Sequence, residues 1–208
     1  MPSPRPARAL ISLAALAQNV RGLSGVADVR RDACGHGLQA CGPVLAAEGL
    51  ALWTDDERPA GTVIEPARLW GLPGGGATPV MTLVGSVLST KVLRVGEGVS
   101  YGYTFRAERD TRVALVSGGY AQGVVREIGN RAHVRVAGHD APIVGRVAMD
   151  ACVVEIGEAE VARGDDVVFF GNPGTGDPDL AVWSDVTRLG APEILSLVGA
   201  RAAREAHR

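Results

Sequence analysis

One short stretch of the chain carries three side chains that are able to do acid–base or nucleophilic chemistry. Asp32, Cys34 and His36 alternate with small residues in the segment Asp-Ala-Cys-Gly-His-Gly at 32–37. A thiol next to an imidazole is the pairing of many covalent catalysts, in which the imidazole acts as the base. Side chains two residues apart seldom face one another, so a structural turn is the competing interpretation.

Only one side chain of this sequence has a primary amine that could form an imine with an aldehyde. The 21 basic residues include one lysine, Lys91, and all the others are arginine. A guanidinium group stays protonated and cannot form an imine. Lys91 lies in a β-branched apolar segment, far in sequence from residues 32–37.

Composition narrows the classes of function. The chain has 208 residues, 46% of them hydrophobic, and a net charge of −2, so no basic surplus is present to attract nucleic acid. Cys34, Cys41 and Cys152 are an odd number of cysteines, and the four histidines show no metal-ligand spacing. We expect buried thiols, no metal site and a reducing, cytoplasmic location.

The N-terminus allows two interpretations. Arg5 and Arg8 precede a short apolar run that ends in Ala-Leu-Ala at 15–17, as in a signal peptide. The same residues read as a strand over 8–12 and an amphipathic helix over 13–23, with Leu13, Leu16 and Val20 on one face. We favour the second interpretation, and no segment is long enough to cross a membrane.

The sequence pattern changes near the Gly-Gly-Gly run at 74–76, which divides the chain into two parts. The first part alternates strand and helix patterns, as parallel sheets require. From residue 79 onward, short β-branched runs separated by glycine-rich turns predict an antiparallel sandwich or barrel. The expected elements of the first part are strands at 8–12, 27–33, 50–54 and 63–72 and helices at 13–23 and 38–48. Two helices, at 183–189 and 192–206, are expected to end the chain, with Pro192 and Glu193 suited to a helix start.

Several segments of the second part resemble the C-terminal domain of the alanine racemase family, which uses pyridoxal phosphate (PLP). They follow one another in the family's order over some 115 residues. The segments are PVMTLVGSV at 79–87, GEGVSYGYTF at 96–105, SGGYAQGVVR at 117–126, GRVAMDACVVEI at 145–156, GDDVVFFG at 164–171 and PEIL at 192–195.

The first part resembles the same family only in separate segments. Residues 5–23 resemble its first strand and helix, 28–37 its Lys-Ala-Asp-Ala-Tyr-Gly-His-Gly segment, and 64–72 its last barrel strand. Only seven residues stand where the family carries the middle of an eight-stranded α/β barrel. The resemblance implies a mixed α+β fold, with a truncated α/β (TIM-type) barrel at 1–76 and an antiparallel barrel-like domain at 77–208.

The cofactor half of the family's site is altered. Racemisation removes a proton from Cα, and PLP stabilises the carbanion through a lysine Schiff base. Arg30 stands at the position of that lysine, and Cys34 at that of a tyrosine that holds the phosphate. No cofactor-binding residue is therefore carried over, and we expect no cofactor.

The other half of the site is retained. By resemblance, Tyr101 is the family's second acid/base, Met149 contacts the substrate carboxylate through its amide, and Tyr120 and Asp150 form the gate of the substrate channel. In this family the tyrosine and methionine serve the cofactor of a partner subunit. Each of these residues also has a structural interpretation: packing for the aromatic residues and Met149, and a turn cap for Asp150.

These observations predict a racemase-like pseudoenzyme that acts as a homodimer or as a partner-binding module, possibly with a full-length racemase. The alternative is a PLP-dependent alanine racemase that is active alone or in complex with a complete subunit. A barrel remnant of three or four strands exposes edges. We therefore expect either a small α/β layer packed on the β domain or a dimer that covers those edges.

Overall fold

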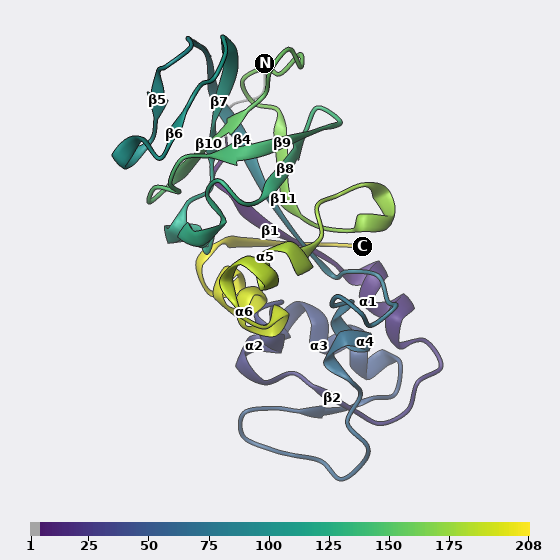
Figure 1. Cartoon of the computed structure of the whole chain (residues 1–208). Coiled ribbons are helices and arrows are strands. Elements are labelled where there is room, and N and C mark those ends of the chain that lie inside the picture. The colour runs from purple at the N-terminus through teal and green to yellow at the C-terminus, as the bar shows by residue number, and fades with distance from the viewer. Residues whose placement is uncertain (1–4) are drawn as a thin grey trace.

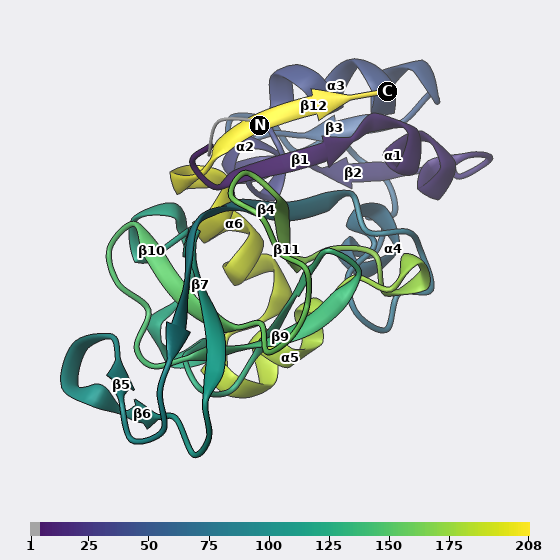
Figure 2. The ribbon, with the colours of Figure 1, turned by 90° about the horizontal axis from the view of Figure 1, so that it is seen from above.

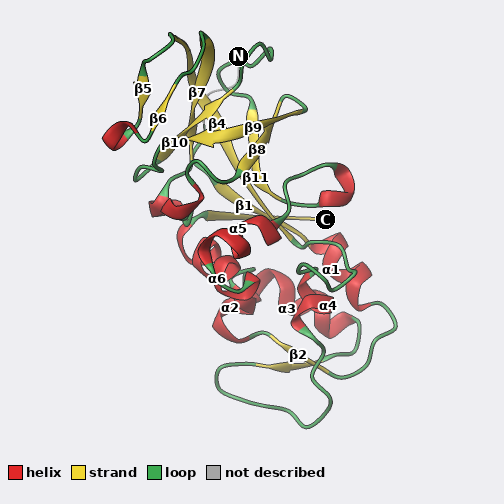
Figure 3. Cartoon of the chain, viewed as in Figure 1, coloured by secondary structure: helices red, strands yellow, loops and turns green. Residues whose placement is uncertain are grey.

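Six antiparallel strands close into a barrel (Figures 1 and 3). The structure is a computed structural model that describes residues 5–208. The strands follow one another in the order β4, β7, β10, β9, β8, β11, and β11 pairs again with β4. They are β4 (Met81–Leu93), β7 (Thr111–Ser117), β8 (His133–Val136), β9 (His139–Val144), β10 (Ala151–Glu155) and β11 (Asp166–Phe170). The closing β11–β4 pairing decides between the two predicted architectures in favour of the barrel.

Strand β4 bends so that it can take part in two sides of the barrel. Its first half pairs with β11 and its second half with β7. At the bend stands Gly85, where a Cβ atom would lie 2.1 Å from the Ser117 carbonyl oxygen and 2.9 Å from the Phe169 ring. Only glycine permits this close approach of the strands. Val116, Ile143 and Phe169 are among the residues that fill the interior.

The first and last strands of the chain extend the sheet beyond the barrel. Strand β1 (Arg8–Ser12) pairs antiparallel with β4, and β12 (Ala203–His207) lies parallel to β1 at the outer edge (Figure 2). The strand–helix interpretation of the N-terminus is confirmed, because α1 (Leu13–Val20) follows directly and Ser12 Oγ accepts a hydrogen bond from the Ala15 amide at 3.2 Å. The prediction of a helix up to residue 206 was wrong. Helix α6 (Ala191–Arg201) ends earlier, and pairing with β1 makes the last residues a strand.

A small α/β layer packs on the barrel. This is the first of the two arrangements expected from the sequence. Strand β2 (Val26–Asp28) pairs in parallel with β3 (Ala51–Trp53), and Val63 forms a parallel bridge to β2. In Figure 1 the helices α2, α3 and α4 lie between this sheet and the barrel. These helices are α2 (Arg30–Cys34), α3 (Leu38–Ala47) and α4 (Pro66–Trp70).

Two predicted strands of this layer were partly wrong. The run 63–72 holds only the Val63 bridge before α4 begins, with Pro66 in its first turn, where the missing N–H costs nothing. The strand predicted at 27–33 ends at Asp28. Residues 31–34 then form a left-handed turn, with φ between 53° and 58° at four consecutive non-glycine positions. Such a conformation costs about 1–2 kcal/mol per residue and persists only where the surroundings fix it.

The remaining elements connect these parts. Helix α5 (Leu180–Thr187) and α6 pack together, and Glu193 Oε2 accepts a hydrogen bond from the Gly190 amide at 2.6 Å at the start of α6. A hairpin projects from the barrel between β4 and β7, and short helical turns lie in the barrel loops. They are β5 (Gly98–Val99), η1 (Tyr101–Tyr103), β6 (Phe105–Arg106), η2 (Tyr120–Gln122), η3 (Arg126–Ile128) and η4 (Pro173–Thr175). Within residues 5–208, no helix is long and apolar enough to cross a membrane.

Candidate functional site

A pocket of about 290 Å³ opens at the carboxyl ends of β2 and β3, where α/β folds place their sites. The left-handed turn of α2 forms one wall, and α4 and the start of α6 form the others. The lining residues are Asp28, Arg30, Arg31, Cys34, Asp55, Pro66, Trp70, Pro192 and Ser196. This pocket therefore includes Arg30, which the resemblance places at the position of the family lysine.

The guanidinium group of Arg30 is held along one edge by Asp28 and lies over a tryptophan ring. Its Nε and Nη2 atoms donate hydrogen bonds to the two carboxylate oxygens of Asp28, at 2.9 and 2.7 Å. The same group lies 3.8 Å from the centroid of the Trp53 ring, and the guanidinium group of Arg58 lies 4.3 Å from that ring. The hydrogen bond from Arg30 lowers the pKa of Asp28, so the pair is ionised at neutral pH. Arg30 is thus fixed by charge and by ring stacking.

Asp32 is occupied with holding the left-handed turn. One carboxylate oxygen accepts the Leu38 amide at 2.7 Å, which caps the start of α3, and the other accepts a hydrogen bond from Arg204 of β12. The Leu38 bond is the main reason why the pKa of Asp32 is lowered. Both oxygens of Asp32 therefore take part in holding the turn.

The structure does not bring Cys34 and His36 together as a nucleophile and its base. The Cys34 thiol lies 3.6 Å from the Ser196 hydroxyl and 3.6 Å from the Pro192 carbonyl oxygen. Burial raises the pKa of Cys34, which keeps the thiol protonated. His36 is buried, stacks on Trp70 at 4.3 Å between ring centroids, and places Nδ1 2.9 Å from the Ala33 carbonyl oxygen. Burial lowers the pKa of His36 to about 4, so the ring is neutral and serves the core.

The predicted site residues of the barrel gather on a separate face. Met149 and Asp150 lie beside the η2 turn that carries Tyr120, since the Ala121 amide donates to the Met149 carbonyl at 2.9 Å and the Gln122 amide group to Asp150 at 3.1 Å. The tip that carries Tyr101 joins this face through Ser100, whose hydroxyl donates to the Arg146 carbonyl at 2.5 Å.

Tyr101 and Met149 of this face are open to solvent, and the tip that carries Tyr101 lies away from the pocket. Tyr101 is 69% exposed and Met149 is 54% exposed. In both views of the ribbon the hairpin of β5 and β6 projects at the far end of the barrel, well apart from the turn α2, which lies among the helices (Figures 1 and 2). Tyr101 therefore cannot serve a ligand bound beside Arg30 of the same chain.

Other candidate groups take no part in the pocket. Lys91 is exposed on β4, opposite Val113 of β7. Cys41 and Cys152 are buried, and burial raises the pKa of each to about 12. The part of the chain that the structure describes holds no cluster of three or more His, Cys, Asp or Glu residues able to bind a metal ion.

The family model for the alanine racemase C-terminal domain matches residues 80–206. The chain belongs to this family. An alanine racemase of Thermobifida fusca is 42% identical over 134 residues, which are 64% of this chain and 36% of that protein. An alanine racemase of Mycobacterium ulcerans is 46% identical over 114 residues, 53% of this chain and 29% of that protein. The chain thus spans about a third of the length of these curated relatives.

Solved structures show the same fold. Alanine racemase from D-cycloserine-producing Streptomyces lavendulae aligns over 100% of this chain and 98% of its own, with a TM-score of 0.81 and 19% identity. The Bartonella henselae alanine racemase, solved with covalently bound pyridoxal phosphate, aligns with a TM-score of 0.80 and 17% identity over 98% of this chain. The six-stranded barrel after an N-terminal α/β region is therefore the architecture of alanine racemases.

The pocket of this family member does not fit the family cofactor. No lysine lines it, and the position that resembles the lysine holds a guanidinium group engaged by Asp28 and Trp53. A covalent bond to an aldehyde needs a primary amine that can lose its proton. Asp28, Trp53 and Arg58 were missed by sequence reasoning, although the spacing of Asp28 and Arg30 allows their ion pair.

Proposed function

We propose that this chain does not carry out PLP-dependent racemisation by itself and acts as a partner-binding module of the alanine racemase family. Its partner is a second copy of the chain or a full-length racemase. The observation that carries the proposal is the engagement of Arg30 by Asp28 and Trp53 at the position of the family lysine. Catalysis by this chain alone would need an amine that its pocket does not offer.

The exposed face of the barrel supports the second half of the proposal. Tyr101 and Met149 are both exposed to solvent, and the loops that carry them are joined by a hydrogen bond from the Ser100 hydroxyl to the Arg146 carbonyl oxygen. Large exposed apolar side chains that are grouped on one rigid face are typical of binding surfaces. In a complex with a complete racemase, this face would offer Tyr101 to the partner's cofactor, and the alternative function, racemisation in complex, would then apply.

A PLP titration tests the first half of the proposal. The purified chain is titrated with PLP, treated with borohydride and analysed by absorbance and peptide mass spectrometry. We expect the PLP spectrum to be unchanged by the protein and no reduced adduct on Lys91. An imine that borohydride fixes onto Lys91 would make the chain a PLP enzyme in its own right.

A mixing experiment tests the second half. The chain is mixed with the Thermobifida fusca racemase in which the tyrosine corresponding to Tyr101 is replaced by phenylalanine. We expect a mixed dimer by light scattering and a gain of racemase activity with the wild-type chain. The Tyr101→Phe variant should give the dimer without the gain, and Tyr103→Phe, on the same turn, should behave as wild type. A chain that stays monomeric, alone and in the mixture, would refute the partner-binding role.

A further inference from the structure

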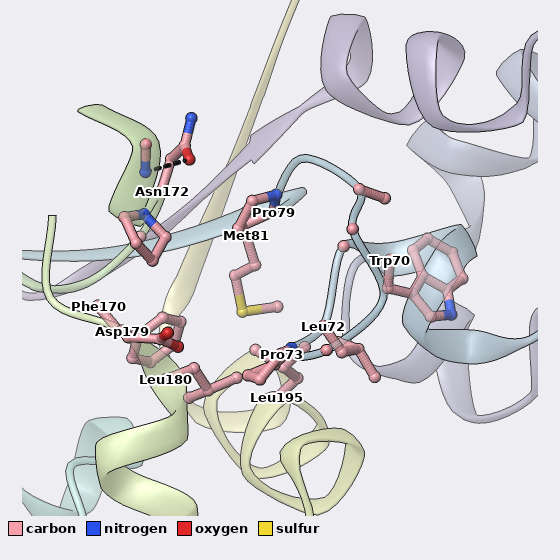
Figure 4. A pocket seen from close by; sticks show the side chains of 17 residues that line it. Trp70, Leu72, Pro73, Pro79, Met81, Phe170, Asn172, Asp179, Leu180 and Leu195 are labelled. Atoms are coloured by element: carbon pink, nitrogen blue, oxygen red, sulfur yellow. Dashed lines mark hydrogen bonds between the residues drawn. The ribbon is translucent and has the colours of Figure 1, made fainter. Parts of the chain in front are cut away.

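A second cavity, of about 240 Å³, lies where the linker after α4 meets the barrel and the C-terminal helices (Figure 4). One wall is the linker from Trp70 to Pro79. The other walls come from Met81 at the start of β4, from the end of β11 with the η4 loop, and from Leu180 and Leu195. None of the predicted site residues lines it.

The interior of this cavity is apolar. Figure 4 shows the Met81 thioether pointing into the space between Trp70, Leu72, Leu180 and Leu195. Glycines of the linker and the η4 loop supply backbone walls that allow a flat ring to approach closely. An engineered apolar cavity of about 150 Å³ in another protein binds benzene, so this cavity has room for one ring with a short substituent.

A single charged group faces this apolar space. Asp179 is the only charged residue of the lining, and it is half-buried. Its Oδ1 atom accepts the Ala181 amide at 2.8 Å and so caps α5. In the region from residue 5 to the C-terminus, Oδ2 has no hydrogen-bond or ion-pair partner. The cavity therefore combines an apolar body with one unpaired negative charge.

We propose that this cavity binds a small primary or secondary amine with one apolar ring. The ring would replace water against Met81, Leu180 and Leu195, and the ammonium group would donate a hydrogen bond to Asp179 Oδ2. An ion pair beside apolar walls is screened less than one on an open surface, which favours a cation over a neutral molecule of the same shape. The proposal is independent of the proposed partner-binding function.

The test compares three probes of equal size on the full chain: benzylamine, benzyl alcohol and benzoate. Backbone amide shifts are followed by NMR during each titration, and a dissociation constant is fitted for each probe. We expect shifts at Gly74, Gly174 and Ala181, with benzylamine binding about tenfold more tightly than benzyl alcohol and benzoate not binding. Equal binding of benzylamine and benzyl alcohol, or shifts elsewhere, would overturn the proposal.

Two variants make the test specific. Asp179→Asn keeps an N-cap side chain but removes the charge, so the preference for benzylamine should disappear while benzyl alcohol still binds. Asp185→Asn, an exposed site on the same helix, should leave the preference unchanged. Ala77→Leu fills the cavity from the linker and should abolish binding of both probes. A preference that survives in Asp179→Asn would refute the assigned role of this carboxylate.

Discussion

Arg204 of the outermost strand donates a hydrogen bond to Asp32, which lies 172 residues earlier in the left-handed turn. The same guanidinium group donates to the Gly35 carbonyl oxygen at 3.3 Å. The strained turn at 31–34 is therefore fixed by the last strand of the chain. Four left-handed residues cost several kcal/mol together, so the contacts that hold them are expected to matter for stability.

We expect Asp32→Ala to lower the free energy of unfolding by about 1–2 kcal/mol, because it removes the acceptor of both the Leu38 amide and Arg204. Asp32→Asn keeps an oxygen for the Leu38 amide and should cost less. Urea denaturation followed by circular dichroism measures the difference. Arg208→Ala, exposed at the end of the chain, serves as the control. Equal stability of Asp32→Ala and wild type would show that the turn is held by other contacts.

Arg30→Lys should lower stability even though it restores the family residue type. Lysine cannot make the two-pronged contact with Asp28 or stack a planar group on Trp53. We expect a lower urea midpoint than for the wild type and a change in tryptophan fluorescence, because Trp53 loses its neighbouring guanidinium group. Arg31→Lys is the matched control, since the Arg31 side chain is 86% exposed and lies 3.7 Å from Asp55. If both substitutions are neutral, Arg30 is a surface residue without a fixed role.

Stability should depend on pH through His36. Burial lowers the pKa of His36 in the folded chain to about 4, from a usual value of 6.5. Between these values the unfolded state binds more protons than the folded state. The contribution of neutral His36 is therefore complete above pH 6.5 and is lost as the pH falls toward 4, by about 3 kcal/mol in all.

The check is a series of urea midpoints over this pH range for the wild type and for His36→Phe, which keeps a ring against Trp70. The phenylalanine variant should lose most of the slope, and replacement of the exposed His133 should leave it intact. A slope that is the same in wild type and His36→Phe would assign the acid sensitivity to other groups, such as the carboxylates of Asp28 and Asp32.

The Cys34 thiol should react slowly despite its place in the pocket wall. Burial raises its pKa, so little thiolate is present near neutral pH. We expect alkylation by iodoacetamide at about pH 8 to be at least tenfold slower in the folded chain than in urea, and Cys41 and Cys152 to be slower still. Peptide mass spectrometry over time gives the rates. Rapid labelling of Cys34 in the folded chain would show that its thiol is a reactive nucleophile after all.

The sequence predicted elements that local patterns determine. Strand 8–12, the helix start at Leu38 and the succession of barrel strands follow from periodicity, glycine-rich turns and resemblance. The predictions failed where distant partners override local preference. Residues 203–207 have a helical composition, yet β1 pairs with them as a strand. Four left-handed residues in a row have no local signature, because their conformation depends on Arg204 and on the close contact between Gly35 and Gly199.

The candidate site shows the same limit. The resemblance places Arg30 at the position of the family lysine, but the sequence did not predict its contacts with Asp28 and Trp53, or the contact of Arg58 with Trp53. Arg58 lies in the segment that follows Trp53, and a contact between a guanidinium group and a ring has no spacing rule in a sequence. Tyr120, Met149 and Asp150 were predicted to act together, and the structure places their loops side by side.

The parallel pairing of β12 with β1 limits how early the first part of the chain can fold during synthesis. Strand β1 leaves the ribosome long before its outer neighbour β12 has been made. The left-handed turn likewise waits for Arg204 and Gly199 before its contacts exist. Contacts between the two ends of a chain are slow to form, because the closure of a long loop comes before any gain in contact energy. The nascent chain therefore exposes the outer edge of β1 until β12 has been made, and the left-handed turn gains its contacts only after that point.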